Sequence, residues 1–188
     1  MAKQYVWLDL ETSGLDPVEN GIVEIGAVLT QQGKQKKIFS QTCNPGDVAI
    51  SEYAMKVNGL SIEQLHHEDP INEVLARFDA EVENKAVPCG WNIASFDLPF
   101  LKEAYKKAGL KWRFDYHVID MMCCANWMAA SGVLEGNRGT GLQAMAKYLG
   151  IDSESFGAAH RALPDVYVTM AVAKELKVKF LSSQKYGF

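Results

Sequence analysis

Asp9 and Glu11, at the end of the apolar segment Tyr5 to Leu10, constrain the fold of this chain more than any other residues. The segment is aromatic and aliphatic, which predicts a strand that is buried on both faces. Side chains two positions apart on a strand point to the same face, so the two carboxylates are expected to lie side by side. In an open α/β sheet, ligands bind at the carboxyl ends of the strands. An isolated Asp-x-Glu pair is nevertheless most often two acidic residues facing water.

Two carboxylates this close would raise each other's pKa in a dry site, because each disfavours the ionised form of the other. A divalent cation removes that conflict, and oxygen ligands favour magnesium or manganese. The pair therefore predicts a metal site, provided that other segments bring further polar side chains to the same place.

The order of the predicted elements indicates a mixed α/β sheet. Strands are expected at 22–30 and 38–43, and the short polar turn between them predicts an antiparallel hairpin. Short apolar strands at 86–90 and 116–120 then alternate with segments of helical periodicity. Helices are expected after the capping-box sequence at Ser61, after Asp69-Pro70, over Phe100 to Ala108, up to Met128, from the capping-box sequence at Thr140 to Gly150, and from Leu163 to about Lys179. A hairpin followed by alternating helices and strands predicts five strands with helices on both faces.

Composition is that of one soluble domain, and residues 1–188 are expected to form a single domain. Apolar residues make up 48% of the 188 residues and charged residues 22%. The net charge of -4 argues against a protein that coats nucleic acid by bulk electrostatics, but permits a local grip on a few nucleotides. No segment has the length of a membrane span or the layout of a signal peptide, so we expect a cytoplasmic protein without membrane contact. The four cysteines lack metal-ligand spacing and are expected to be buried, reduced thiols: Cys43, Cys89, Cys123 and Cys124.

Three later polar residues interrupt apolar surroundings. Asp97 follows the strand at 86–90 and precedes Pro99, so it could simply start the next helix. Asp165 lies among core residues of the last predicted helix, where an uncompensated carboxylate costs several kcal/mol or takes up a proton. His160 lies just before that helix, a position where a histidine is usually a cap or a solvated residue.

Together these segments resemble the DEDD superfamily of 3′–5′ exonucleases, specifically the DEDDh subgroup with a histidine in its third motif. The motifs occur in order as Asp-Leu-Glu-Thr-Ser-Gly-Leu-Asp-Pro (9–17), Asn-Ile-Ala-Ser-Phe-Asp (92–97) and His-Arg-Ala-Leu-Pro-Asp (160–165). The resemblance extends from about residue 5 to about residue 177 and implies a ribonuclease H-like fold. The first motif is more similar to the proofreading exonuclease domain of bacterial DNA polymerase III than to oligoribonucleases, which commonly carry Met after the Glu.

The resemblance assigns a role to each acidic residue. It implies two divalent metal ions, Mg²⁺ or Mn²⁺, as in two-metal phosphodiester hydrolysis. Asp9 would bridge both ions, Glu11 and Asp165 would complete the site of the attacking water, and Asp97 would serve the leaving-group side. His160 would be the general base, since an ordinary histidine pKa near neutrality suits a rate that rises with pH.

The resemblance also places the 3′ end of the substrate beside the first motif. Thr12, Ser13 and Gly14 are candidates to hold the 3′-hydroxyl end and its sugar. Leu15 is expected to be either a wedge against the terminal base or an ordinary core residue beside a turn.

Three further residues have weaker assignments. Asn92 is expected to orient the second motif or to touch substrate, and Phe96 is either a core residue or a stacking platform. Arg138, in a loop with three glycines, is a candidate for a phosphate contact.

The predicted function is a metal-dependent 3′–5′ exonuclease that releases nucleoside 5′-monophosphates from nucleic acid, with DNA and single-stranded ends favoured. One alternative is an exoribonuclease of the same family. A second is a noncatalytic subunit that binds 3′ ends or assists proofreading in a polymerase complex, against which the complete set of five residues weighs. A polymerase or a second copy of the chain is an open possibility as partner.

Overall fold

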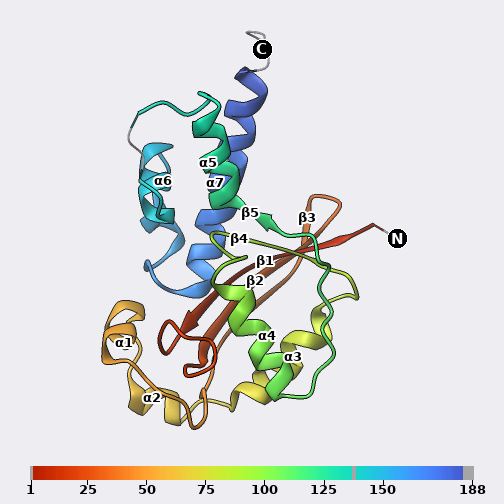
Figure 1. Ribbon diagram of the computed structural model, residues 1–188, viewed down its shortest axis with the longest axis vertical. Helices are drawn as coiled ribbons and strands as arrows, with labels where there is room; N and C mark the ends of the chain where they lie inside the picture. The colour runs from red at the N-terminus through yellow and green to blue at the C-terminus, as the bar shows by residue number, and fades with distance from the viewer. Residues whose placement is uncertain (1, 137–138, 184–188) are drawn as a thin grey trace.

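A five-stranded sheet forms the centre of the computed structural model, which describes residues 2–136 and 139–183. Its strands lie in the order β3-β2-β1-β4-β5 (Figure 1). They are β1 (Gln4–Thr12), β2 (Ile22–Gln31), β3 (Lys34–Thr42), β4 (Val87–Gly90) and β5 (Ile119–Asp120). Strand β2 is antiparallel to both β1 and β3, whereas β4 and β5 run parallel to β1. The predicted mixed sheet with an antiparallel hairpin is confirmed.

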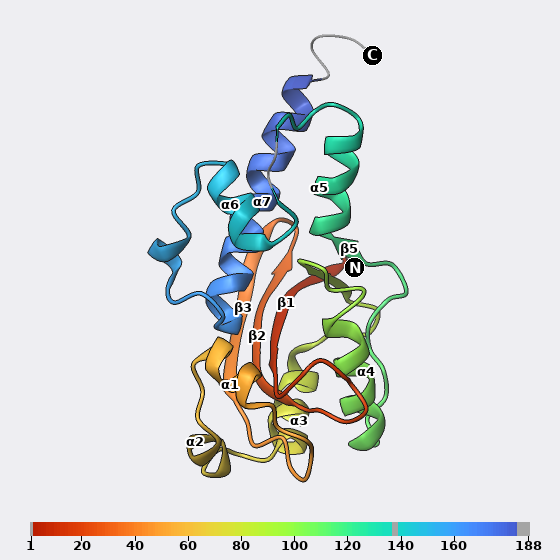
Figure 2. The ribbon, with the colours of Figure 1, turned by 60° about the vertical axis from the view of Figure 1, so that its left-hand side comes forward.

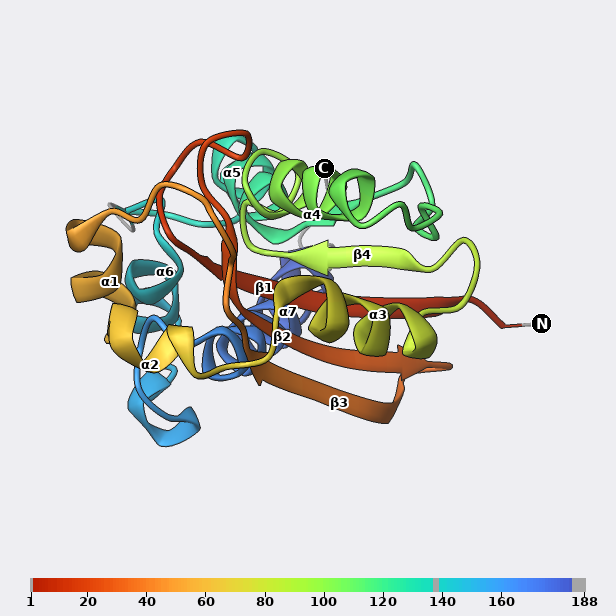
Figure 3. The ribbon, with the colours of Figure 1, turned by 90° about the horizontal axis from the view of Figure 1, so that it is seen from below.

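Helices cover both faces of this sheet, as predicted (Figures 2 and 3). On one face, α3 and α4 pack on the apolar residues of β1 and β2, and on the other α7 crosses β1 and β2 with α5 and α6 beside it. The helices are α1 (Glu52–Asn58), α2 (Ile62–His66), α3 (Ile71–Glu81), α4 (Asp97–Lys107), α5 (Met121–Ala130), α6 (Leu142–Tyr148) and α7 (Ala162–Ser183), with a short 3₁₀ helix at Ser153–Phe156.

Strand β1 separates an apolar face from a functional face. The side chains of Val6, Leu8 and Leu10 are buried against α3 and α4, while those of Asp9 and Glu11 point to the other face and are only partly buried. The prediction that this strand is buried on both faces was therefore wrong, because Tyr5 and Trp7 on the second face are also only partly buried. The reason is that α7 and its neighbours cover this face of β1 incompletely.

Gly26 allows α7 to approach the sheet closely. It pairs with Asp9 across the β1–β2 ladder, and a methyl group added to it would lie 2.4 Å from both the Ala162 carbonyl carbon and the Leu163 nitrogen. A larger residue would push the start of α7 away from β2. The glycine thus sets the height at which the first turn of α7, with Asp165, stands above β1.

Several predicted boundaries differ from the structure. Strand β3 begins at Lys34, four residues earlier than expected, because the hairpin continues through an exposed edge strand in which lysines block further pairing. Helix α1 was not predicted; its Ser51 cap precedes only seven residues. The capping box at Ser61 is confirmed, but α6 is capped by Gly141 and not by a Thr140 side chain. Strand β5 keeps only two of its five expected residues.

The cysteines divide into two pairs. All four are free thiols, as expected, and Cys43 and Cys89 are buried, but Cys123 and Cys124 are exposed on α5. Among the helices in residues 2–136 and 139–183, none has the length and apolar character needed to cross a bilayer.

We predict that Gly26→Ala lowers the free energy of unfolding by about 1–3 kcal/mol, the usual cost of overpacking a tight contact. Chemical denaturation measures this change. Gly141→Ala is the control, because a methyl group there meets no atom within 4 Å and the φ angle of -78° suits any residue; its cost should stay below about 1 kcal/mol. Equal losses in the two variants would contradict the close approach as the cause.

Candidate active site

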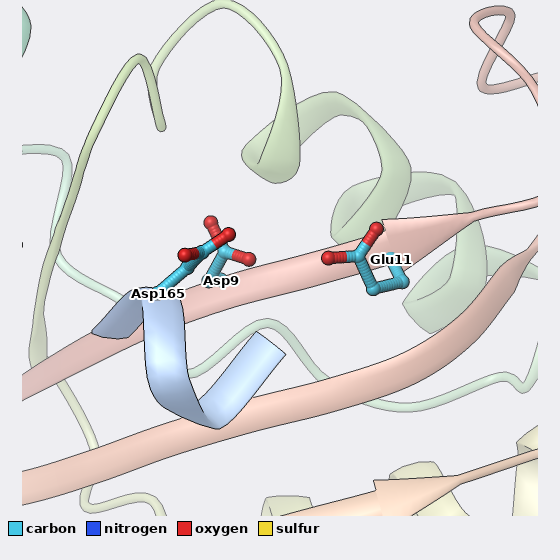
Figure 4. Close-up of side chains that lie close together, drawn as sticks. All are labelled: Asp9, Glu11 and Asp165. Carbon is cyan, nitrogen blue, oxygen red and sulfur yellow. The ribbon is translucent and has the colours of Figure 1, made fainter. Parts of the chain in front are cut away.

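Three carboxylates from two elements converge above the end of β1. Asp9 and Glu11 come from β1, and Asp165 comes from the first turn of α7 (Figure 4). One carboxylate oxygen of each lies within 4.8 Å of the others. The alternation of β1 places the first two on one face, and the approach at Gly26 adds the third.

These carboxylates hold their protons unusually tightly. Burial, followed by the charges of Asp97 and Glu11, raises the pKa of Asp9 well above its ordinary value. Burial, followed by the charge of Asp165, raises the pKa of Glu11 to about 8. The pKa of Asp165 is also raised, mainly by burial. A cation bound between them would offset both the burial and the mutual repulsion.

The chemistry of this donor set fits a divalent metal ion. All three side chains offer carboxylate oxygens, which are the ligands that hard cations such as Mg²⁺ and Mn²⁺ prefer. Their convergence, together with the raised pKa values, is what a metal site is expected to show in the absence of its ion.

Asp97 lies beside this group but outside it. It is the first residue of α4, is 3% exposed, and its Oδ1 accepts a hydrogen bond of 2.9 Å from the Leu10 backbone N–H. That N–H is available because the paired residues of β1 and β4 end at Trp7. Burial raises the pKa of Asp97 to about 7, although the bond from Leu10 acts in the opposite direction. The structure therefore places Asp97 close enough to both acids of β1 to raise their pKa values.

A second acidic residue, Asp120, holds the turn that leads to Asp97. Its Oδ1 accepts from the Asn92 N–H at 3.2 Å and its Oδ2 from the Ala94 N–H at 3.1 Å, while it also caps α5. Asn92 has a φ of 56°, a left-handed conformation that asparagine tolerates better than most residues. The contact to Asp120 comes from the Asn92 backbone, so the two predicted roles of Asn92, orienting the second motif and touching substrate, stay predictions. The sequence reasoning missed Asp120, although an acid between a predicted strand and a predicted helix is a capping signal.

His160 stands at the rim of the carboxylate group. Its backbone N–H donates to Asp165 Oδ2 at 3.1 Å, and its exposed side chain lines a hollow of about 320 Å³ together with Asp9 and Asp165. Gln143, from the first turn of α6, lines the same hollow and donates from Nε2 to Asp165 Oδ1 at 2.9 Å. Gln143 was also missed as a site residue, since nothing in the sequence indicates that the first turn of α6 lies against α7.

A second hollow, of about 280 Å³, lies on the other side of Glu11. Its walls include Glu11, Thr12, Gly14, Leu15 and Phe96, and residues of α1 close it. Leu15 is 84% exposed, so the alternative that it is a core residue is wrong. Phe96 is only partly buried: it packs on the core residue Phe100 and also lines this hollow, while its role as a stacking platform stays a prediction.

The contribution of α1 could not be foreseen, because that helix was not predicted. Tyr53, 77% exposed, stands at the rim, and Asn58 donates from Nδ2 to the Thr12 carbonyl at 3.3 Å. The buried Oδ1 of Asn58 has no hydrogen-bond partner among the described residues. The hollow thus has apolar rims and an unused acceptor close to Thr12.

Ser13 does not face this hollow, contrary to prediction. It is fully buried; its hydroxyl donates to the Ala49 carbonyl and accepts from the Gly21 N–H. Its backbone N–H and carbonyl are also bonded, to Gly21 and Ser51. Ser13 therefore fastens the turn after β1 and has no polar group left for a ligand. Arg138, the candidate for a phosphate contact, lies outside the described residues.

Comparison with known proteins gives a family and a fold. Residues 6–173 match the model of a protein family described as exonuclease, the RNase T family. The DNA polymerase III PolC-type of Thermotoga petrophila is 33% identical over 169 residues, which are 89% of this chain and 11% of the polymerase. That of Caldanaerobacter subterraneus is 36% identical over 107 residues, 57% of this chain and 7% of the polymerase. The chain thus spans about a tenth of the length of these curated relatives.

Solved structures of E. coli exonuclease I share the fold. A zinc-bound complex with single-stranded DNA has a TM-score of 0.84 at 20% identity, covering 95% of this chain and 41% of the other. A complex with a dA16 oligonucleotide has a TM-score of 0.82 at 19% identity, covering 94% and 41%. The predicted ribonuclease H-like architecture is confirmed by this likeness.

We predict that Glu11→Gln stabilises the metal-free protein at pH 8. The folded-state pKa of Glu11, about 8, lies above its ordinary value of 4.5, so the proton that it keeps contributes stability that is full below pH 4.5 and is lost as the pH rises to about 8. The neutral amide of the variant does not undergo that loss. The free energy of unfolding of Glu11→Gln should therefore exceed that of the wild type by on the order of 1 kcal/mol at pH 8, but by little at pH 5. Thermal unfolding in a chelator measures the difference.

Added Mn²⁺ should make the wild type more stable than Glu11→Gln at pH 8, because the wild type has one more carboxylate with which to bind the ion. Glu63→Gln, at an exposed position of α2, is the control, and its stability should equal that of the wild type both in chelator and in Mn²⁺. A Glu11→Gln protein that is less stable than wild type in chelator at pH 8 would refute the electrostatic account.

Proposed function

Because this chain belongs to the RNase T exonuclease family, whose members include the DEDD 3′–5′ exonucleases, we propose that it removes nucleoside 5′-monophosphates from the 3′ end of single-stranded DNA. The observation that carries the proposal is the convergence of Asp9, Glu11 and Asp165 between two hollows. We propose residues 1–188 as a single exonuclease domain for this reaction.

The terminal nucleotide is proposed to occupy the hollow beside Glu11. Leu15 and Tyr53, both exposed at its rim, supply apolar surfaces for a base, and Phe96 supplies an aromatic wall. Thr12 and Gly14 line the same hollow, where a sugar hydroxyl needs polar partners. In this position the scissile phosphate reaches the carboxylates.

Asp9, Glu11, Asp97 and Asp165 would hold two divalent metal ions, Mg²⁺ or Mn²⁺, which activate the attacking water and stabilise charge on the phosphoryl and leaving oxygens. Asp97 is proposed to serve the leaving-group side, partly through water, because it lies outside the group formed by the other three. Its bond from Leu10 keeps it oriented while it does so.

His160 is proposed as the general base. Its ring borders the hollow that Asp9 and Asp165 also line, and the backbone bond to Asp165 Oδ2 fixes the residue beside a proposed metal ligand. An exposed ring can pass the proton that it accepts to solvent.

DNA is favoured over RNA because the curated relatives are named as DNA polymerases and the exonuclease I structures hold single-stranded DNA. The same relatives make a polymerase complex the partner that we favour for this chain. A proofreading role would follow from such a partner.

We expect a 5′-labelled single-stranded DNA to yield a ladder that shortens from its 3′ end in Mg²⁺ or Mn²⁺. Matched RNA and duplex substrates test the preference, and Asp9→Ala should lower kcat at least about 1,000-fold, because it removes the central carboxylate. Faster degradation of RNA would instead support an exoribonuclease. Binding without cleavage in either metal ion would support a noncatalytic 3′-end-binding subunit.

We predict that the rate of the wild type rises with pH and that His160→Ala removes this rise, because the proposed base accepts a proton only in its neutral form. The variant should lose about 100- to 10,000-fold in kcat, the usual contribution of general base catalysis. Rates measured from pH 5.5 to 9 with saturating substrate test this. His66→Ala, at an exposed position of α2, is the control. An unchanged pH profile in His160→Ala would exclude the role.

A further inference from the structure

An ion pair between a partly exposed arginine and a buried carboxylate joins the third motif to the sheet. Glu24 lies on β2 directly opposite Glu11 of β1, and its side chain is 2% exposed. Arg161 holds it with two bonds, from Nε to Oε2 at 2.8 Å and from Nη2 to Oε1 at 3.0 Å. The Ala162 N–H donates to the same Oε2 at 3.3 Å. Both oxygens of Glu24 are therefore taken by two consecutive residues at the start of α7.

These bonds fix the chain on one side of His160. The histidine has a φ of 58°, a left-handed conformation that a residue other than glycine keeps only when its neighbours impose it. On its carboxyl side, Arg161 and Ala162 are bound to Glu24, and its own N–H is bound to Asp165 Oδ2. The exposed residues 157–159 before it are not buried against the sheet. The ion pair thus attaches this segment to β2 beside the close contact of Ala162 with Gly26.

Glu24 is not part of the carboxylate group itself. The oxygens that converge belong to Asp9, Glu11 and Asp165, while those of Glu24 face Arg161. Without its partner, Glu24 would add another uncompensated negative charge beside Glu11. Such ion pairs generally add little net stability over apolar side chains of similar size, but they can fix the geometry of the segments that they join.

We propose that the Glu24–Arg161 pair is a positioning clamp that sets where His160 and Asp165 stand relative to Asp9 and Glu11. The inference rests on the proposed function, since it concerns how that reaction's base and metal ligands are held. Neither clamp residue is required to touch the substrate or the reacting atoms.

The chain offers a matched control in a second arginine–carboxylate pair. Arg113 Nε bonds both oxygens of Asp79, each at 2.9 Å, and ties the segment after α4 to α3. Its side chain is 42% exposed against 41% for Arg161, and Asp79 is 11% exposed. This pair lies beside α3, on the opposite face of the sheet from α7. It has the same chemistry without a link to the third motif.

The test compares Arg161→Ala with Arg113→Ala in a single-strand degradation assay with Mn²⁺. Both variants should melt at lower temperature, because each leaves a carboxylate unpaired. Only Arg161→Ala should lower kcat, by about 10- to 100-fold as for other residues that orient metal ligands, with KM changed less than about threefold.

Two further variants test the pair itself. Arg161→Lys keeps the positive charge but cannot bond both carboxylate oxygens as the guanidinium does, so its kcat should lie between those of Arg161→Ala and the wild type. Glu24→Gln combined with Arg161→Ala should lose no more than Arg161→Ala alone, because the two residues act as one unit.

Hydrogen exchange provides a readout that does not depend on activity. In the metal-free protein the amides of His160 and Ala162 should exchange faster in Arg161→Ala and be unchanged in Arg113→Ala. If Arg161→Ala fails to fold, Arg161→Lys and Glu24→Gln carry the same comparison with milder changes.

Unchanged kcat and unchanged exchange in these variants would overturn the clamp. So would a rise in KM alone, because it would make Arg161 a substrate contact. A different result would separate the two ideas. If the wild-type protein degrades no nucleic acid, but the Arg161→Ala variant still shows faster amide exchange, the proposed function is refuted and the attachment of the segment to β2 is established.

Discussion

Repulsion among four carboxylates at the end of β1 is the constraint on which the rest of the site depends. Asp9, Glu11 and Asp165 converge within 4.8 Å, and Asp97 lies beside them. Burial makes this worse, because it removes the water that would screen the charges. The protein holds the acids close in spite of this, so the surrounding structure has to keep them from moving apart.

Each of the later acids is held by contacts from a different element. Leu10 donates its backbone N–H to Asp97, and Gln143 and the His160 N–H donate to the two oxygens of Asp165. Asp120 supports Asp97 indirectly: it accepts hydrogen bonds from the backbone of the turn that leads to Asp97. Donors that bond the carboxylates fix their orientation and favour the ionised form that a metal ion requires. The fold therefore serves the site through hydrogen bonds as much as through apolar packing.

Local patterns were sufficient for the sheet and for the residues of the three motifs. The alternation of β1 and the hairpin after it follow from nearest neighbours in the chain, which is why they could be predicted. Helix α1 and the ends of β3 and β5 could not, since they are short or exposed and depend on contacts with distant segments. Ser13 shows the same limit at the site: it belongs to the first motif, but the packing of the turn after β1 uses all its polar groups.

The sequence by itself determined which residues are proposed to carry the chemistry, because Asp9, Glu11, Asp97, His160 and Asp165 interrupt apolar segments and fall in three ordered motifs. Only the tertiary structure decided how they meet. The approach of α7 at Gly26 and the pairing of Glu24 with Arg161 join residues more than 130 positions apart, and spacing along a chain contains no information about such contacts. The pair Asp9 and Glu11 was visible as two acids on one face; that a third carboxylate joins them depends on how closely a helix packs on the neighbouring strand.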